Sequence, residues 1–347
     1  MATEMWSRRL FLAAGAASTV APAWAALGGA RFLAAAREPS GDYALCGLTD
    51  GGDIAFRVPL TARGHAAAAH PTRPEAVAFA RRPGTFALVL DCSDGQVVRR
   101  LAAPDGRHFY GHGAFLDGGR VLATTENAYA SGAGRIGFWD ADAGYRRIGE
   151  VASGGIGPHE VIRLPGTEIL AVANGGIRTH PAHGREKLNL DKMRPNLAYL
   201  DDGAVVERIE LPDPKLSIRH IAARADGTVG MGLQSERAPE ETVPMFATHR
   251  RGGPPTVYGA HLAPGFAGYV GSVAWSRDGT RLAVTAPRGN RAAIWDGAEI
   301  ELLHRPDICG VTAAGGGFAF TDGLGGILTE RGTRKHPCNW DNHLVSL

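Results

Sequence analysis

The sequence has little net charge, few cysteines and no long apolar run. Its 37 lysines and arginines against 35 aspartates and glutamates leave a formal charge of +2, so no strong field attracts nucleic acid or an anionic membrane. The four cysteines form no metal-binding Cys-x-x-Cys pair. No Gly-x-Ser-x-Gly elbow, phosphate-binding loop or His-Glu-x-x-His motif occurs, which removes the common hydrolase, nucleotide and zincin signatures. These absences argue against a nucleic-acid-binding protein and a membrane protein.

The first 25 residues carry the pattern of an export signal. A twin arginine at Arg8 and Arg9 precedes a short apolar stretch, and an Ala-x-Ala cleavage pattern ends at Ala25. This order is typical of a twin-arginine signal peptide. The apolar stretch is much shorter than the roughly 20 residues that a membrane-spanning helix needs. We therefore expect residues 1–25 to be removed and residues 26–347 to form a periplasmic protein without membrane insertion.

Glycine is abundant, and the sequence repeats. The 48 glycines show no Gly-X-Y period, so they indicate many tight turns and hence many short strands. A short apolar strand that ends in a turn recurs, with six copies starting at residues 65, 112, 159, 220, 272 and 310. More β-rich runs follow each copy. Four antiparallel strands in about 40–50 residues are typical of one blade of a β-propeller.

The two ends of the chain supply a seventh blade. Residues 31–37, 42–48 and 53–60 resemble the second, third and fourth strands of a blade, and residues 343–347 offer the missing first strand. Pairing of the C-terminal strand with the N-terminal blade would close the ring and remove exposed edges. The sequence therefore predicts an all-β fold, a single seven-bladed β-propeller over residues 26–347. A two-sheet β-sandwich is the alternative, but it does not require one four-strand unit to recur in register.

Histidines recur at the start of the first strand, which lines the channel of a propeller. Five of the seven starts carry one: His65, His112, His159, His220 and His343. Imidazole is the commonest transition-metal ligand, so we expect an ion of iron or copper, or of zinc, at the channel mouth. The expected ligands are four of these histidines and one carboxylate: His65, His112, His159, His220 and Glu126, with Glu160 as the alternative carboxylate. In the competing interpretation, each histidine only joins its blade to the backbone of a neighbour.

The ends of the second strands reach the same face and add polar groups. The longest insertion, residues 175–196, is placed to cover the channel mouth. The residues expected to bind a cofactor or small ligand are Asn174, Arg178 and His180. A second hypothesis is an enzyme of lactonase or quinoprotein type, with an ion held by Glu126, Asn174 and Asp322 from separate blades. A third is a protein-interaction scaffold.

The cysteines leave two possibilities open. In an exported protein, four cysteines allow disulfides with three full pairings. Cys309 begins the last blade and Cys338 precedes the closing strand, so a bridge between them would fasten the ring closure. Cys46 and Cys92 lie in third strands of adjacent blades and are as readily interpreted as free buried thiols.

Several motifs together resemble one family of bacterial proteins. They are YGHGAF at 110–115, TTEN at 124–127, GIGPHE at 155–160, ANGGIRTH at 173–180, SIRH at 217–220, GYVGS at 268–272 and WDNH at 340–343. These are similar to an uncharacterised, domain-of-unknown-function family of twin-arginine-exported proteins. The resemblance implies genes beside imelysin-like lipoproteins and a di-haem oxidoreductase, and hence a part in periplasmic iron acquisition with those proteins as partners. It implies no reaction, so the leading hypothesis is a non-enzymatic metal-handling protein.

Overall fold

The computed structural model describes residues 29–238 and 240–347. The predicted signal peptide, residues 1–25, lies outside the described residues. Within the described part of the chain, no helix is both long enough and apolar enough to cross a membrane.

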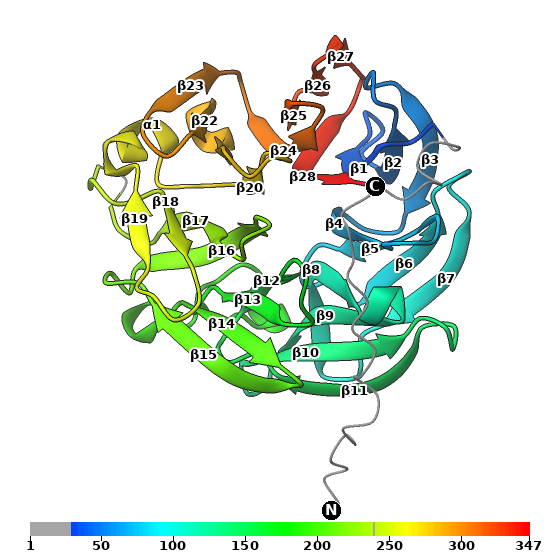
Figure 1. Ribbon diagram of the computed structural model, residues 1–347. Coiled ribbons are helices and arrows are strands. Elements are labelled where there is room, and N and C mark those ends of the chain that lie inside the picture. The colour runs from blue at the N-terminus through cyan, green and yellow to red at the C-terminus, as the bar shows by residue number, and fades with distance from the viewer. Residues whose placement is uncertain (1–28, 239) are drawn as a thin grey trace, which may run out of the picture.

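Seven four-stranded antiparallel sheets stand around a central axis as the blades of a propeller (Figure 1). From the innermost strand outward, the first four sheets are β28 (Asn339–Ser346), β1 (Phe32–Arg37), β2 (Tyr43–Leu48), β3 (Ile54–Leu60); β4 (Gly64–Ala69), β5 (Glu75–Ala80), β6 (Phe86–Asp91), β7 (Val97–Ala102); β8 (Arg107–Leu116), β9 (Val121–Ala128), β10 (Ala133–Asp140), β11 (Arg146–Ala152); β12 (Pro158–Arg163), β13 (Leu170–Asn174), β14 (Asn196–Asp201), β15 (Ala204–Glu210). The other three are β16 (Leu216–Ala223), β17 (Val229–Ser235), β18 (Phe246–His249), β19 (Thr256–Tyr258); β20 (Ser272–Trp275), β21 (Leu282–Ala286), β22 (Arg291–Trp295), β23 (Ile300–His304); β24 (Ile308–Ala314), β25 (Gly317–Asp322), β26 (Gly326–Thr329), β27 (Gly332–Lys335). The helical pieces are short: α1 (Ala263–Phe266) and the 3-10 turns η3 (Asp117–Gly119), η4 (Pro181–His183), η5 (Leu190–Lys192), η6 (Ala260–Leu262) and η7 (Pro287–Gly289).

The ring closes as the sequence predicts. Strand β28 pairs antiparallel with β1, from Phe32 opposite Ser346 to Arg37 opposite Asn339. The last strand of the chain thus becomes the innermost strand of the first blade, and the all-β, seven-bladed fold is confirmed. The β-sandwich alternative is wrong, because each sheet packs against two neighbours around an axis instead of against one facing sheet.

Side-chain size follows distance from the axis. Strands near the axis are rich in alanine, as in FLAAAR of β1 and EAVAFA of β5, and are mostly buried. Small side chains suit this region because the blades converge there and the space between sheets narrows. Larger groups fill the wider gaps farther out, for instance Phe56 and Phe86, which belong to one core cluster shared by two blades. Outermost strands such as β7 are largely exposed.

The four cysteines are free thiols, and all of them are buried. The Cys309–Cys338 bridge considered from the sequence is therefore not formed. The sulfur of Cys309 instead lies 3.4 Å from the carbonyl oxygen of Asp341 and 3.7 Å from the hydroxyl of Thr321. Closure of the ring thus rests on the β28–β1 strand pairing and on packing.

The disc has two faces. One carries the turns between first and second strands, among them residues 164–169 and 224–228, and is called here the first-turn face. The other carries the links between blades and the insertion between β13 and β14, residues 175–195, and is called the insertion face.

Candidate functional site

Each channel histidine lies at an irregularity of the innermost strand. The pairing register of β8 with β9 shifts between Phe109 and Gly113, around His112. Corresponding shifts lie between Pro158 and Glu160 in β12, and between Ile218 and His220 in β16. Strands β4 and β28 are irregular in the same way around His65 and His343. A β-bulge re-aims the side chain at its position, and here the repeated bulges direct imidazoles towards the axis.

The five imidazoles meet in the channel. The ring centroids of His65 and His343 are 4.4 Å apart, those of His159 and His220 4.8 Å, and those of His112 and His159 5.1 Å. All five side chains are buried, with 2–7% of their surface exposed. We call this set, His65, His112, His159, His220 and His343, the histidine layer. The sequence places these residues together correctly, but it puts them at the open mouth. The bulges draw them inside instead.

A glycine makes room for this packing. Gly111 precedes His112 and has φ of +105°, a backbone conformation that residues with a Cβ rarely adopt. A Cβ added there would lie 2.5 Å from Cδ2 of His65. The Gly-His pair in β8 therefore serves the contact between two imidazoles from adjacent blades.

Two carboxylates hold three of the rings. Oδ1 of Asp341 lies 3.1 Å from Nδ1 of His65. Glu160 reaches two histidines, with Oε1 3.4 Å from Nδ1 of His112 and Oε2 3.3 Å from Nδ1 of His220. A carboxylate hydrogen-bonded to one ring nitrogen, as Asp341 is to His65, fixes the tautomer and is the usual outer shell of a metal-binding histidine. Glu160 lies at ion-pair distance from His112 and His220.

Several ring nitrogens lack a partner. Nε2 of His112, Nδ1 of His159 and Nε2 of His343 are buried and make no hydrogen bond. Buried polar atoms are rarely left unsatisfied, and each one costs roughly 1–3 kcal/mol. Two triads bring their ligand atoms within 4.8 Å of one another: His65, His112 and His343, and His112, His159 and His220. The spacing and chemistry of these donors therefore fit a transition-metal ion.

Burial favours the uncharged form of four rings of the histidine layer, those of His65, His159, His220 and His343. It lowers the pKa of His65 to about 3, although Asp341 opposes this shift. It also lowers the pKa values of His159, His220 and His343, and neighbouring imidazoles or arginines add to the effect. Neutral imidazole is the form that binds metal. At pH 7 these rings thus offer lone pairs without first losing a proton.

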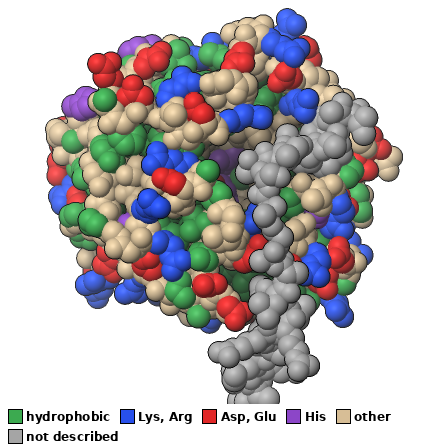
Figure 2. Space-filling model, in the orientation of Figure 1, with side chains coloured by type: hydrophobic (Ala, Val, Ile, Leu, Met, Phe, Trp, Pro, Cys, Tyr) green, Lys and Arg blue, Asp and Glu red, His purple; other side chains and the backbone are tan. Residues whose placement is uncertain are grey.

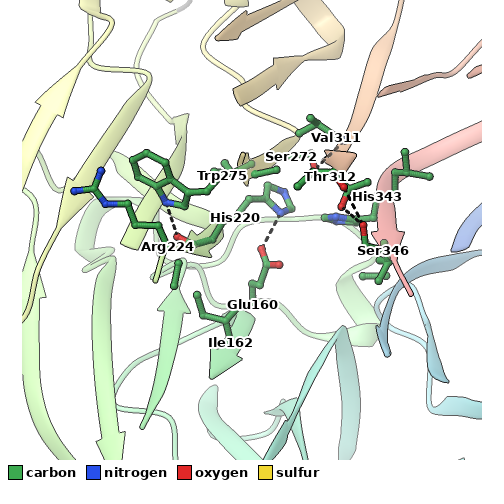
Figure 3. Close-up of a pocket in the computed structure, with 18 of the residues that line it drawn as sticks. Glu160, Ile162, His220, Arg224, Ser272, Trp275, Val311, Thr312, His343 and Ser346 are labelled. Atoms are coloured by element: carbon green, nitrogen blue, oxygen red, sulfur yellow. Dashed lines mark hydrogen bonds and ion pairs between the residues drawn. The ribbon is translucent and has the colours of Figure 1, made fainter. Parts of the chain in front are cut away.

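A pocket of about 650 Å³ leads from the first-turn face to the histidine layer. Glu160, His220, Ser272 and His343 line it together (Figure 3). His112 is also among its lining residues. Histidine side chains are also visible at the centre of the face drawn in Figure 2. The pocket gives an ion or a small ligand a route to the rings.

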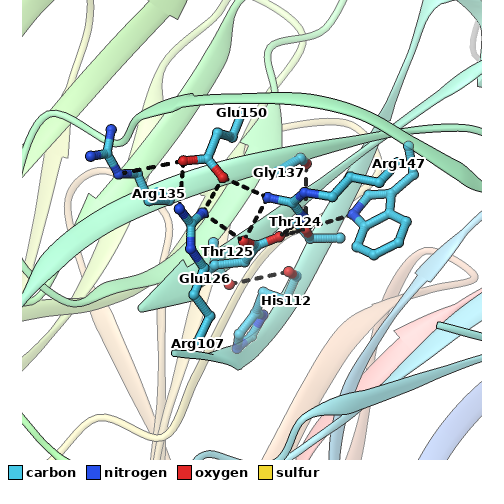
Figure 4. Close-up of polar contacts among 10 residues, drawn as sticks. Arg107, His112, Thr124, Thr125, Glu126, Arg135, Gly137, Arg147 and Glu150 are labelled. Carbon is cyan, nitrogen blue, oxygen red and sulfur yellow. Dashed lines mark hydrogen bonds and ion pairs between the residues drawn. The ribbon is translucent and has the colours of Figure 1, made fainter. Parts of the chain in front are cut away.

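Glu126 belongs to a different network. Its side chain is fully buried, and its carboxylate accepts hydrogen bonds from Nη1 of Arg147 at 2.6 Å and from Nη1 of Arg107 at 3.3 Å (Figure 4). The same arginines also pair with Glu150. The structure therefore does not bring Glu126 to the imidazoles as the expected carboxylate ligand. Glu160, the alternative, is the carboxylate that lies beside the imidazoles, next to Nδ1 of His112 and of His220, but it does not belong to either histidine triad.

Replacement of Glu126 by glutamine should destabilise the fold by about 3 kcal/mol, because it leaves two partly buried arginines short of a carboxylate. Urea unfolding measures this loss. Glu210→Gln, which breaks an exposed pair with Arg194, is the matched control and should cost less than about 1 kcal/mol. Equal stability losses in the two variants would contradict a structural role for Glu126.

The three residues expected to bind a cofactor or small ligand each form hydrogen bonds with other groups of the protein. The amide of Asn174 bonds Ser153 and Asn196, and the guanidinium of Arg178 donates to the carbonyl of Ala130 at 3.0 Å. His180 accepts from the backbone N–H of Ala182. Asp322, invoked for a lactonase-like ion, pairs with Arg305 and caps its own turn at Leu324 and Gly326. Among residues 29–238 and 240–347, the groups with metal-ligand spacing contain histidines only.

Asp341 is the functional residue that sequence reasoning missed. It lies two positions before His343, so the alternation of a strand offered a signal. Its partner His65 is on the neighbouring blade, 276 positions away in the sequence, and strand alternation alone does not reveal that pairing. Asp341 also accepts from Arg63 at 2.5 Å and from Arg81 at 3.1 Å. These contacts, with that of His65, hold its pKa well below the usual range despite burial.

Comparisons with known proteins give an uncharacterised family and distant propellers. The family described as "Protein of unknown function (DUF1513)" matches residues 58–347. No curated protein matches. The hydrazine synthase of Kuenenia stuttgartiensis is similar with a TM-score of 0.58 at 12% identity, covering 89% of this chain and 95% of that one. The β-propeller domain of Myceliophteria thermophila Cps50 (Swd1) is similar with a TM-score of 0.55 at 14% identity, covering 82% and 89%. At such identities the likeness shows the fold alone.

Proposed function

Because the chain belongs to the DUF1513 family of unknown function, its role has to be argued from its own site, and we propose that it is a metal-handling β-propeller. It binds one first-row transition-metal ion in the histidine layer. The observation that carries the proposal is the set of buried ring nitrogens without a partner, on His112, His159 and His343. In a site built only for blade contacts, these atoms would face hydrogen-bond partners.

The donor chemistry selects the class of ion. Neutral imidazole suits iron, copper, nickel and zinc, whereas magnesium and calcium prefer oxygen ligands. The chain supplies His112, His159 and His220 as one triad, with His65 and His343 next to it. Glu160 and Asp341 position three of these rings. We propose iron or copper as the ion held there, with the pocket on the first-turn face as its entrance.

The cellular role follows from the signal pattern and the family resemblance. We propose export by the twin-arginine pathway and work in the periplasm as an accessory of iron acquisition. Its partners there would be imelysin-like proteins and a di-haem oxidoreductase. What supports this is the Arg8-Arg9 pattern together with the histidine layer, which provides a place for the metal.

Metal content tests the proposal directly. Protein purified from the periplasm should contain close to one iron or copper ion per chain by elemental analysis. After treatment with a chelator, titration with Cu²⁺ and, without oxygen, Fe²⁺ should restore one ion per chain. Protein without stoichiometric metal that also takes up no ion in the titration would refute a metal-handling function.

A further inference from the structure

Five arginines gather on the insertion face, on the side of the histidine layer away from the 650 Å³ pocket. Arg63 precedes β4, and Arg81 and Arg82 follow β5, at the end of the sheet where Gly64 pairs with Ala80. Arg185 lies in the insertion, and Arg219 precedes His220 in β16. We call this set, Arg63, Arg81, Arg82, Arg185 and Arg219, the arginine cluster.

Two members of the arginine cluster have a counter-charge and three do not. Arg63 and Arg81 pair with Asp341. In the described part of the chain, Arg82, Arg185 and Arg219 make no side-chain hydrogen bond or ion pair, and Nε of Arg219 is buried without a partner. The carboxylate of Glu236 is near Arg219, but it forms its ion pair with Lys187.

The unpaired arginines lie close enough to repel one another. Burial lowers the pKa of Arg82 to about 10, and Arg219 and Arg185 add to that shift. The pKa of Arg185 is lowered chiefly by Arg81 and then by burial. Arg82 and Arg219 are partly buried, and partly buried cations without a counter-charge are costly in a folded protein. An anion bound among them would remove this cost.

A small pocket is already present at the cluster. It has a volume of about 110 Å³, and Arg82, His108, Thr179, His180 and Arg185 are among its lining residues. Arginine presents a planar fork of donors that matches carboxylate and phosphate oxygens. The residues that line this pocket include two arginines and no carboxylate.

We propose that this pocket binds an oxyanion, the phosphate or carboxylate group of a small ligand, between Arg82 and Arg185. Arg219 adds positive charge nearby. This site is separate from the metal centre and does not require that a metal bind. It lies beside the histidine layer, since Arg219 is next to His220 in the chain and contributes to lowering the pKa of His159.

Calorimetric titration of chelator-treated protein with inorganic phosphate and, separately, with citrate tests the site. We expect the wild-type chain to bind at least one of the two probes. The dissociation constant should be at least tenfold larger in Arg82→Gln and in Arg185→Gln. Arg185 is exposed on the insertion, so its replacement tests the site without putting the fold at risk. Preference for phosphate identifies a phosphate ligand, and preference for citrate identifies a polycarboxylate.

Arg146→Gln is the matched control, because Arg146 is an exposed arginine on the outermost strand β11. It should bind both probes as the wild-type chain does. The proposal is overturned if neither anion binds at millimolar concentration, or if Arg146→Gln weakens binding as much as the two cluster variants do. The protein is free of metal throughout, so an absence of anion binding would leave the metal-handling proposal untouched. In the same way, an absence of metal binding would leave the oxyanion proposal untouched.

Discussion

Replacement of His159 by alanine should weaken metal binding at least 100-fold. Nδ1 of His159 is buried without a hydrogen-bond partner, and its ring belongs to the triad with His112 and His220. Loss of an outer-shell partner alone commonly costs 10–100-fold in metal affinity, so loss of a ligand should cost more. Titration with Cu²⁺ in competition with a chromophoric chelator measures the dissociation constant over the required range.

Two further variants show whether a loss of metal affinity in His159→Ala is specific to the histidine layer. Glu160→Gln keeps the size of the side chain but removes the charge that faces His112 and His220, and should weaken binding about 10–100-fold. His304→Ala removes an exposed histidine at the end of β23 and should leave the affinity unchanged. Binding by His159→Ala equal to that of the wild-type chain, or equal losses in His159→Ala and His304→Ala, would show that the ion sits elsewhere.

The fold was predictable because a propeller repeats its unit. One strand pattern recurs at residues 112, 159, 220 and 272, and this recurrence shows where each blade begins. In a propeller the first strand of every blade lines the central axis. Histidines at the same position of several first strands must therefore lie near one another at the axis. The ring of imidazoles follows from the repeat, without any knowledge of side-chain geometry.

The depth and the partners of the site were not predictable in this way. Whether a histidine lies at the mouth or inside the channel depends on where each bulge falls, and a bulge is one extra residue that the repeat does not reveal. The choice between Glu126 and Glu160 was not predictable either. Arg107 and Arg147, which belong to the same blade as Glu126, form ion pairs with its carboxylate. These ion pairs keep Glu126 away from the histidine layer. Side-chain pairing of this kind is a property of the packed structure.

The metal-free protein should lose stability steeply when the pH falls below about 6.5. His65, His159, His220 and His343 have pKa values lowered by burial. Below pH 6.5 the unfolded chain therefore binds protons that the folded chain does not, and the free energy of unfolding falls with pH. His65, His159 and His343, whose pKa values lie far below the ordinary one, each contribute up to about 1.4 kcal/mol per pH unit, so these three together give roughly 4 kcal/mol per unit.

The carboxylates act in a lower pH window and do not mask this effect. Glu160 and Asp341 have lowered pKa values, so their contribution is present above their ordinary pKa of about 4 and is lost only below it. Urea unfolding at pH 7.5, 6.5 and 5.5 with a chelator present isolates the histidines. His159→Gln should reduce the slope by about 1.4 kcal/mol per pH unit, because the pKa of His159 lies well below its ordinary value; His304→Ala should not change it. A stability that stays level across this range would mean that the four rings are protonated in the folded chain, which would remove the neutral donors that the metal centre requires.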